Sequence, residues 1–267
     1  MRTSGQFLWR FTGALALLSF LVLAAGFAFA LNPQMAAPGN VTPAVPGANG
    51  TTTPAAPPVI PSGKLNMVTL GDSLTRGVGD ANGQGYVGLV RDALAKKTGQ
   101  APMLTNFAIS GQQSNALLEQ LELTQVRALL PQANLILFTI GGNDLFQQSG
   151  ELDVLDEKKL AQARESLAAN FKSIVMKIRM LNPNATVVYL SLYNPFGNTQ
   201  AAKETIRPVL DWNAEAERIA ASFPNVLVVP TYDLFVKKEA NYLYTDHFHP
   251  NAKGYTRMAE RVVRALE

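Results

Sequence analysis

Beyond residue 63, the chain alternates between short apolar runs of strand length and longer stretches with helical spacing. Such alternation is typical of an α/β fold, in which helices bury both faces of a parallel sheet. The expected strands are 65–70, 103–108, 135–140, 186–191 and 226–229. The expected helices are 86–98, 114–130, 157–181, 201–222 and 252–266. The sequence therefore predicts one domain over residues 64–267, built on a five-stranded parallel sheet.

Polar and glycine-rich segments follow these expected strands. In a parallel α/β sheet, functional loops leave the carboxyl ends of the strands. The segments are GDSLTRG (71–77), NFAISG (106–111), GGND (141–144) and YNPF (193–196), and TDHFHPN (245–251) directly precedes the last helix. We therefore expect the functional residues to gather at one edge of the sheet.

The only two histidines of the chain lie in the TDHFHPN segment. A carboxylate three residues before a histidine can reach its Nδ1 proton, so Asp246 and His249 form a candidate acid-base pair. His247 is adjacent to Asp246 and is expected to point elsewhere. Two alternatives are an ordinary turn, with Thr245 or Asp246 as a helix cap, and a His-x-His metal site completed by carboxylates and water.

Ser73 is the candidate nucleophile for such a base. It lies between an apolar strand and a helix, where its hydroxyl can project above the sheet near a helix N-terminus. Gly71 and Gly77 permit the tight path that this turn requires. The alternative is a plain strand-to-helix turn in which Asp72 or Ser73 is the N-cap.

Acyl transfer also needs hydrogen-bond donors for a developing oxyanion. Gly141 and Gly142 allow a close turn after the third strand, and Asn143 can then offer its side-chain amide. Gly111, after the second strand, can offer its backbone N–H. Glycine and asparagine are also common turn residues, so the prediction depends on the combination with Ser73 rather than on either residue alone.

Together these segments resemble the conserved blocks of the GDSL lipase and acylhydrolase family, also called SGNH hydrolases. GDSL at 71–74 matches the block of the nucleophile, Ser73, and NFAISG brings Gly111 to the second block. GGND matches the third block, with Asn143 as the oxyanion donor, and DHFH at 246–249 matches the DxxH block of Asp246 and His249. The resemblance covers about residues 66 to 264.

The resemblance implies a flavodoxin-like three-layer α/β/α sandwich and hydrolysis of carboxylic esters or thioesters without cofactor or metal. It implies a Ser-His-Asp triad and an oxyanion hole made by Ser73, Gly111 and Asn143, in the manner of a lipase, esterase or lysophospholipase. Phe146, Asn194 and Phe196 are candidate substrate-pocket residues, with packing as the alternative for the aromatic rings. Two other functions stay open: a cell-wall carbohydrate O-acetylesterase and a non-catalytic membrane-tethered binding protein.

The N-terminal quarter of the chain has a different character. Residues 11–31 are apolar and uncharged and follow Arg2 and Arg10, which predicts a membrane segment with the remainder of the chain outside the cell. Cleavage near Ala30, giving a secreted protein, is the alternative. Residues 32–63 contain eight prolines, four glycines and no charge, which predicts a disordered linker. The overall pattern resembles membrane-anchored lipase-like proteins of Gram-positive bacteria.

Composition narrows the remaining possibilities. The chain has no cysteine, which excludes disulfides, thiolate nucleophiles and lipid-modified cysteine. Without Arg2 and Arg10, the 23 basic residues fall to 21 against 20 acidic ones. A body so close to neutral lacks the basic surface that nucleic acid binding requires, so we expect an ester substrate and a membrane as partners. The oligomeric state is left open.

Overall fold

The computed structural model describes residues 64–147, 150–151 and 154–267. The predicted membrane segment (1–31) and linker (32–63) lie outside the described residues. Within the described ranges, no helix is both long enough and apolar enough to span a bilayer.

Five parallel strands form the central sheet. They are β1 (Asn66–Gly71), β2 (Met103–Asn106), β3 (Leu135–Thr139), β6 (Thr186–Leu190) and β7 (Val226–Val229), in the spatial order β2-β1-β3-β6-β7. Every residue of β3 is buried, as expected for a strand covered on both faces. The sequence prediction of a five-stranded parallel sheet is therefore confirmed, and each strand begins within one residue of its predicted start.

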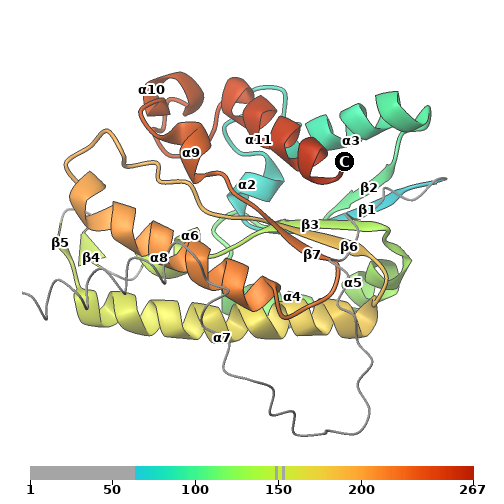
Figure 1. Ribbon diagram of the computed structural model, residues 1–267, viewed down its shortest axis with the longest axis horizontal. Helices are drawn as coiled ribbons and strands as arrows, with labels where there is room; N and C mark the ends of the chain where they lie inside the picture. Colours follow the sequence, from blue (N-terminus) through green and yellow to red (C-terminus); the bar gives the residue numbers. More distant parts are fainter. Residues whose placement is uncertain (1–63, 148–149, 152–153) are drawn as a thin grey trace, which may run out of the picture. The chain divides into compact units, whose positions relative to one another are not determined.

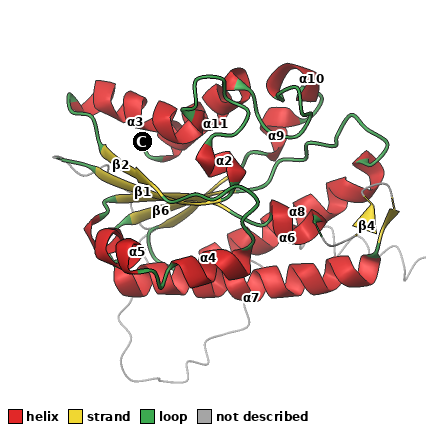
Figure 2. Cartoon of the chain, turned by 180° about the vertical axis from the view of Figure 1, so that it is seen from behind, coloured by secondary structure: helices red, strands yellow, loops and turns green. Residues whose placement is uncertain are grey.

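Helices cover both faces of this sheet (Figures 1 and 2). One layer contains α3 (Gly85–Thr98) and α11 (Ala252–Ala265), which pack against each other, with the short helices α2 (Ser73–Arg76), α9 (Tyr232–Phe235) and α10 (Glu239–Tyr242) beside them. The other layer contains α4 (Ser114–Gln120), α5 (Thr124–Leu129), α6 (Gly142–Phe146), α7 (Glu157–Leu181) and α8 (Ala202–Ala220). Each layer buries its own apolar cluster against the sheet.

The longest helix illustrates how the sequence specifies these layers. In α7, Leu167, Phe171, Ile174 and Ile178 are fully buried at intervals of three or four residues, which is the spacing of one helical face. Asp156 caps its N-terminus by accepting from the N–H groups of Lys158 and Lys159. The observed bounds equal the predicted 157–181.

The predicted helix 114–130 is the one clear departure. The chain forms two helices, α4 and α5, separated by a turn at residues 121–123, followed by a 3₁₀ turn at Leu130–Gln132. Leu117 before the break, Leu121 within it and Val126 after it are all buried, so the apolar spacing continues through it. Other features that were not predicted are the short helices α6, α9 and α10 and the two-stranded antiparallel sheet of β4 (Gly150–Glu151) and β5 (Val154–Leu155).

The strand order determines where a site can form. From β1 the chain moves outward to β2 and then returns past β1 to β3, so the loops after β1 and β3 leave the sheet toward opposite layers. A crevice opens at such a switch point, outside the carboxyl ends of the two strands. Ser73 follows β1 and Asn143 follows β3, which places both at this crevice.

Candidate active site

The GDSL turn begins with a close contact between two strands. Gly71 has φ of +108°, and a Cβ at this position would lie 1.9 Å from the carbonyl oxygen of Thr139 in β3. No side chain fits there, so glycine is the residue that lets β1 turn sharply beside β3. The turn carries the next residues out of the sheet at the switch point.

Ser73 opens α2 immediately after this turn. Asp72 is the N-cap of the helix, and its carboxylate accepts from the Leu74 N–H at 3.0 Å. Gly77 ends the helix in the left-handed conformation, and a Cβ there would meet the backbone of Gly85. Of the two candidate N-caps, Asp72 is therefore the one that the structure shows, and Ser73 is the first residue of the helix.

The structure brings Ser73, His249 and Asp246 into one hydrogen-bonded line. Ser73 Oγ lies 2.8 Å from His249 Nε2, across 176 residues of sequence. His249 Nδ1 lies 2.7 Å from Asp246 Oδ2. The serine is buried while the carboxylate is partly exposed, so the base lies between the protein interior and solvent.

Besides contacting the imidazole, Asp246 stabilises the backbone of its own turn. Its Oδ1 accepts from the backbone N–H groups of Phe248 and His249, both at 3.0 Å, which closes the turn. Burial alone would raise the pKa of this carboxyl, but the hydrogen bonds from the His249 ring and the two amides outweigh it, and the pKa is lowered. The carboxylate therefore stays ionised beside the ring. His247 is exposed with φ of +55°, and none of the described residues hydrogen-bonds to its side chain.

The loops after β2 and β3 are tied together beside Ser73. The Asn143 side-chain amide donates to the carbonyl of Gln112 at 3.0 Å, and Gln113 Nε2 donates to the carbonyl of Asn143 at 3.3 Å. Gly111, with φ of +77°, directly precedes this pair of contacts. In the described part of the chain, the N–H groups of Ser73 and Gly111 donate to no protein acceptor. Ser73, Gly111 and Asn143 all border one cavity.

A family model for GDSL-like lipases and acylhydrolases matches residues 69–257, a span that contains Ser73, Gly111, Asn143, Asp246 and His249. The chain belongs to the GDSL-like lipase/acylhydrolase family. It is a GDSL-type esterase or lipase with the α/β fold of SGNH hydrolases.

Three relatives illustrate this membership. YpmR, an uncharacterized protein of Bacillus subtilis, is 36% identical over 206 residues, which covers 75% of this chain and 81% of YpmR. The spore germination lipase LipC of Bacillus licheniformis is 28% identical over 207 residues, covering 74% of this chain and 94% of LipC. The crystal structure of the lipase Lip_vut3 from a goat rumen metagenome superposes with a TM-score of 0.67 at 27% identity, covering 76% of this chain and 97% of the lipase.

Buried polar residues behind the GDSL turn were missed by the sequence analysis. Thr139 Oγ1 donates to Asp72 Oδ1 at 2.6 Å, and Thr75 Oγ1 lies within 2.8 Å of both the Thr139 hydroxyl and the Tyr86 hydroxyl. Burial raises the pKa of the Asp72 carboxyl, although hydrogen bonds from Thr139 and the Leu74 N–H oppose the rise. An acidic residue at the end of an apolar strand was the available signal for this network.

Asp144 is a second residue that the sequence analysis did not single out. Its carboxylate accepts from the N–H of Ser114 at 2.9 Å and from the Ser114 hydroxyl, and Asn170 Nδ2 donates to that hydroxyl at 3.0 Å. Burial raises the pKa of Asp144, while the Ser114 hydrogen bonds act against the rise. Its place beside Asn143 in GGND was the signal. These contacts fix α4, and with it the loop of Gly111, against α6.

Two of the three predicted pocket residues line the site. Phe146 and Phe196 pack edge to face at 6.0 Å between ring centroids and border a cavity of about 430 Å³ that also contains His249. The prediction for Asn194 is wrong, because this residue lies behind the wall. It is buried, its Nδ2 donates to Thr205 Oγ1 at 3.0 Å, and its Oδ1 accepts from the Phe196 N–H at 3.0 Å. Asn194 therefore shapes the loop and does not border either cavity at Ser73.

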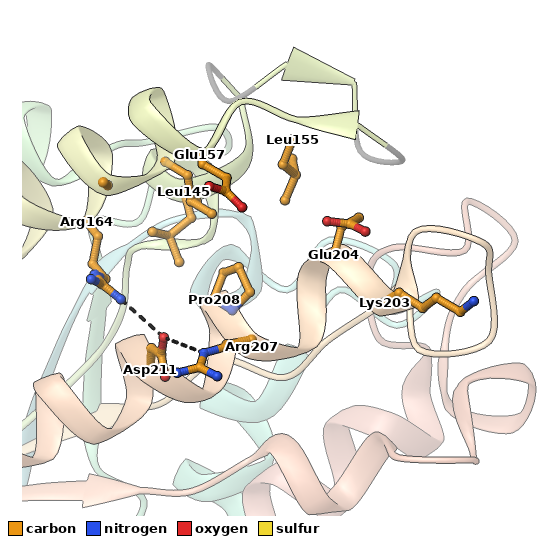
Figure 3. A pocket seen from close by; sticks show the side chains of 11 residues that line it. Leu145, Leu155, Glu157, Arg164, Lys203, Glu204, Arg207, Pro208 and Asp211 are labelled. Atoms are coloured by element: carbon orange, nitrogen blue, oxygen red, sulfur yellow. Dashed lines mark hydrogen bonds and ion pairs between the residues drawn. The ribbon is translucent and has the colours of Figure 1, made fainter.

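A separate cavity of about 290 Å³ lies between α7 and α8 (Figure 3). Leu145, Leu155 and Pro208 provide its apolar surface. Asp211 pairs there with Arg164 at 3.2 Å and with Arg207 at 3.6 Å, as the dashed lines show. None of the candidate catalytic residues lines this cavity.

Proposed function

We propose that this chain is a serine hydrolase that cleaves carboxylic esters through Ser73, His249 and Asp246. The observation that supports this most strongly is the continuous pair of contacts Ser73 Oγ to His249 Nε2 and His249 Nδ1 to Asp246 Oδ2, at 2.8 and 2.7 Å. A hydroxyl, an imidazole and a carboxylate in this order form the constellation that activates serine in acyl transfer.

The mechanism follows from the positions of the protons. His249 takes the proton of Ser73 Oγ as the oxygen attacks the ester carbonyl, and Asp246 stabilises the imidazolium. His249 then protonates the leaving alcohol, which departs as the acyl-serine forms. In the second half, His249 removes a proton from water, the hydroxide attacks the acyl-serine, and the imidazolium returns the proton to Ser73.

The oxyanion of each tetrahedral intermediate is held by three donors in this proposal. They are the N–H groups of Ser73 and Gly111 and the side-chain amide of Asn143. The amide hydrogen bond from Asn143 to Gln112 supports this role, since it fixes the geometry of one donor relative to the loop of another. Preorganised donors of this kind cost no rearrangement when charge develops.

The substrate in this proposal is a small-molecule, lipid or glycan ester, with a thioester as a chemically equivalent option. The mechanism uses only protein groups and needs no cofactor. A non-catalytic binding protein is the weaker candidate, because a binding role gives no reason to maintain a buried serine in contact with a paired imidazole.

We further propose that residues 1–31 anchor the protein in the cell membrane and that residues 32–63 hold the catalytic domain, 64–267, outside the cell. This proposal rests on the uncharged 21-residue run and the flanking Arg2 and Arg10. Fractionation of cells producing the full chain is the test. Full-length protein in the membrane fraction supports an anchor, whereas a shortened protein in the medium that begins near Leu31 supports cleavage.

Turnover of p-nitrophenyl acetate by wild type and Ser73→Ala tests the catalytic proposal. We expect wild-type turnover with a loss on the order of 10⁵-fold or more in kcat for the variant, at unchanged thermal stability. Ser166→Ala is the matched control, because this exposed serine lies in α7 and borders neither cavity at Ser73. Equal turnover by wild type and Ser73→Ala would remove Ser73 from the mechanism.

A further inference from the structure

Two cavities of different size meet at Ser73. The smaller, about 30 Å³, is bordered on its far side by Leu192, Tyr193 and Pro195. The larger, about 430 Å³, extends past Gly111 and His249 instead. The two share Ser73 together with Asn143, Phe146 and Phe248, so a substrate at the serine can occupy both at once.

The chemistry of the tetrahedral intermediate assigns each cavity a part of the substrate. The carbon bonded to Ser73 Oγ carries three other groups: the oxyanion, the leaving oxygen and the acyl chain. The leaving oxygen must face His249 to receive a proton, and the oxyanion must face the Gly111 N–H. Both of these residues line only the larger cavity. The acyl chain is therefore left with the smaller one.

We propose that the small cavity is an acyl subsite that accepts an acetyl group and rejects long chains, while the large cavity takes a bulky alcohol. This inference rests on the proposed function, since it uses the same serine and imidazole. An apolar cavity of about 150 Å³ binds benzene, which corresponds to roughly 25 Å³ per carbon. By that measure the small cavity holds about one carbon beyond the carbonyl.

The walls of the small cavity are fixed by hydrogen bonds and close packing. The Tyr193 hydroxyl donates to the carbonyl of Phe248 at 2.6 Å, and the Tyr193 ring stacks on Phe235 at 4.1 Å between centroids. Asn213 pairs with both the N–H and the carbonyl of Leu192, at 2.9 and 2.8 Å. Because packed interiors resist expansion, a longer acyl chain cannot widen this space cheaply.

The large cavity differs mainly in size, with more than ten times the space of the acyl subsite. Its surface is mostly apolar, with Val78, Phe196 and Phe248 among its lining residues, and Ser110 and Gln147 add polar side chains. These features fit a bulky alcohol better than the simple alcohol of a small volatile ester. The chemical class that we assign is therefore a short acyl ester, above all an acetate, of a bulky alcohol.

A chain-length series tests the acyl subsite. The full chain is assayed with p-nitrophenyl acetate, propionate, butanoate, hexanoate and octanoate, each below the concentration at which micelles form. We expect kcat/KM to fall by about 100-fold from acetate to octanoate, because each excess methylene must be forced into a packed wall. A flat profile, or a preference for octanoate, would overturn the assignment.

Two variants locate the effect in the structure. Leu192→Ala enlarges the far wall, and we expect the octanoate-to-acetate ratio of kcat/KM to rise by about 10-fold. Since Leu192 is buried, Pro195→Ala provides a milder enlargement that should move the ratio in the same direction should Leu192→Ala not fold. Phe196→Ala is the control, because Phe196 lines only the large cavity and its loss should leave the chain-length profile unchanged. An altered profile in Phe196→Ala alone would place the acyl chain in the large cavity.

The same experiment separates this inference from the proposed function. Failure of the wild type to release p-nitrophenol from every ester would contradict the proposed function itself. Release that depends on Ser73, combined with a preference for long chains, would contradict the acyl subsite alone. Acetylated xylose and ethyl acetate then compare alcohols at a constant acyl group, and we expect a higher kcat/KM for the sugar acetate.

Discussion

The two turns that meet at the catalytic hydrogen bond are built in opposite ways. The GDSL turn, residues 71–77, is embedded in the core, where Asp72 and Thr75 belong to a buried network with Thr139. The turn at residues 244–250 lies largely at the surface, and its backbone is held by the carboxylate of Asp246 within the turn and by the Tyr193 hydroxyl from outside it. The comparison teaches that the proposed nucleophile, Ser73, is positioned by the fold itself, whereas the proposed base, His249, is positioned by a few separate hydrogen bonds.

Removing the imidazole should have the largest effect, and it should fall on activity alone. We expect His249→Ala to lower kcat by 10⁴-fold to 10⁶-fold, because both proton transfers are lost. Since His249 lies on a surface turn, the free energy of unfolding should change little. His247→Ala, two residues away, is the matched control and should retain wild-type kcat. Similar losses for both variants would show that the turn as a whole matters and not the ring of His249.

Substitution of Gly71 in the GDSL turn should instead lower the free energy of unfolding. Gly71→Ala places a Cβ 1.9 Å from the Thr139 carbonyl at φ of +108°, so we expect a loss of more than about 4 kcal/mol in the free energy of unfolding. In Gly83→Ala, φ is +66° and no atom lies within 4 Å, so the loss should be about 1 to 2 kcal/mol. Urea unfolding measures both variants. Equal losses would contradict the close approach of β1 and β3.

Tyr193→Phe, which alters the turn at residues 244–250, should have an intermediate effect on stability and on kcat. The variant removes the hydroxyl that donates to Phe248, which directly precedes His249. We expect a loss of about 1 to 3 kcal/mol in stability from the unpaired carbonyl, and a loss of about 10-fold in kcat as the imidazole moves. Tyr244→Phe is the control in the same turn, because its hydroxyl contacts no acceptor among the described residues. An unchanged kcat in Tyr193→Phe would separate this hydrogen bond from the position of the base.

The smallest expected effect is on how stability depends on pH, through Asp72 in the GDSL turn. Because burial raises the folded-state pKa of Asp72, its contribution to stability is fully present below the unfolded pKa of about 3.9 and is lost as pH rises through the folded pKa. Asp72→Asn has the same shape and does not ionise. We therefore expect the variant to gain stability relative to wild type as pH rises from about 4 to neutrality. A difference that is constant over this range in urea unfolding would contradict the raised pKa.

Most of the fold could be predicted because the apolar spacing of this chain is clear. Helix 157–181 was predicted to the residue, since one face of it is uninterrupted and Asp156 marks its start. The break between α4 and α5 could not be predicted, because neither glycine nor proline occurs at residues 121–123 and apolar residues continue on both sides. Tertiary packing decides that boundary.

The candidate site, like the fold, could be predicted only in part. Motif residues such as Ser73 and His249 are recognisable from type and order, and the structure places them within hydrogen-bonding distance. The hydrogen bonds of Tyr193 and Thr139 could not be predicted, because they join segments that only the folded sheet brings together. Asn194 misled the prediction for the same reason, since a polar residue after a strand can face the loop interior as easily as the pocket.

The central claim is that His249, in the turn at residues 244–250, activates the Ser73 hydroxyl. Covalent labelling tests this claim most directly. The full chain is treated with a serine-directed fluorophosphonate, and the modified residue is found by peptide mass spectrometry. We predict a single adduct at Ser73, formed far more slowly in His249→Ala and at the wild-type rate in His247→Ala. An unlabelled Ser73, or labelling at the same rate without the imidazole of His249, would contradict the account.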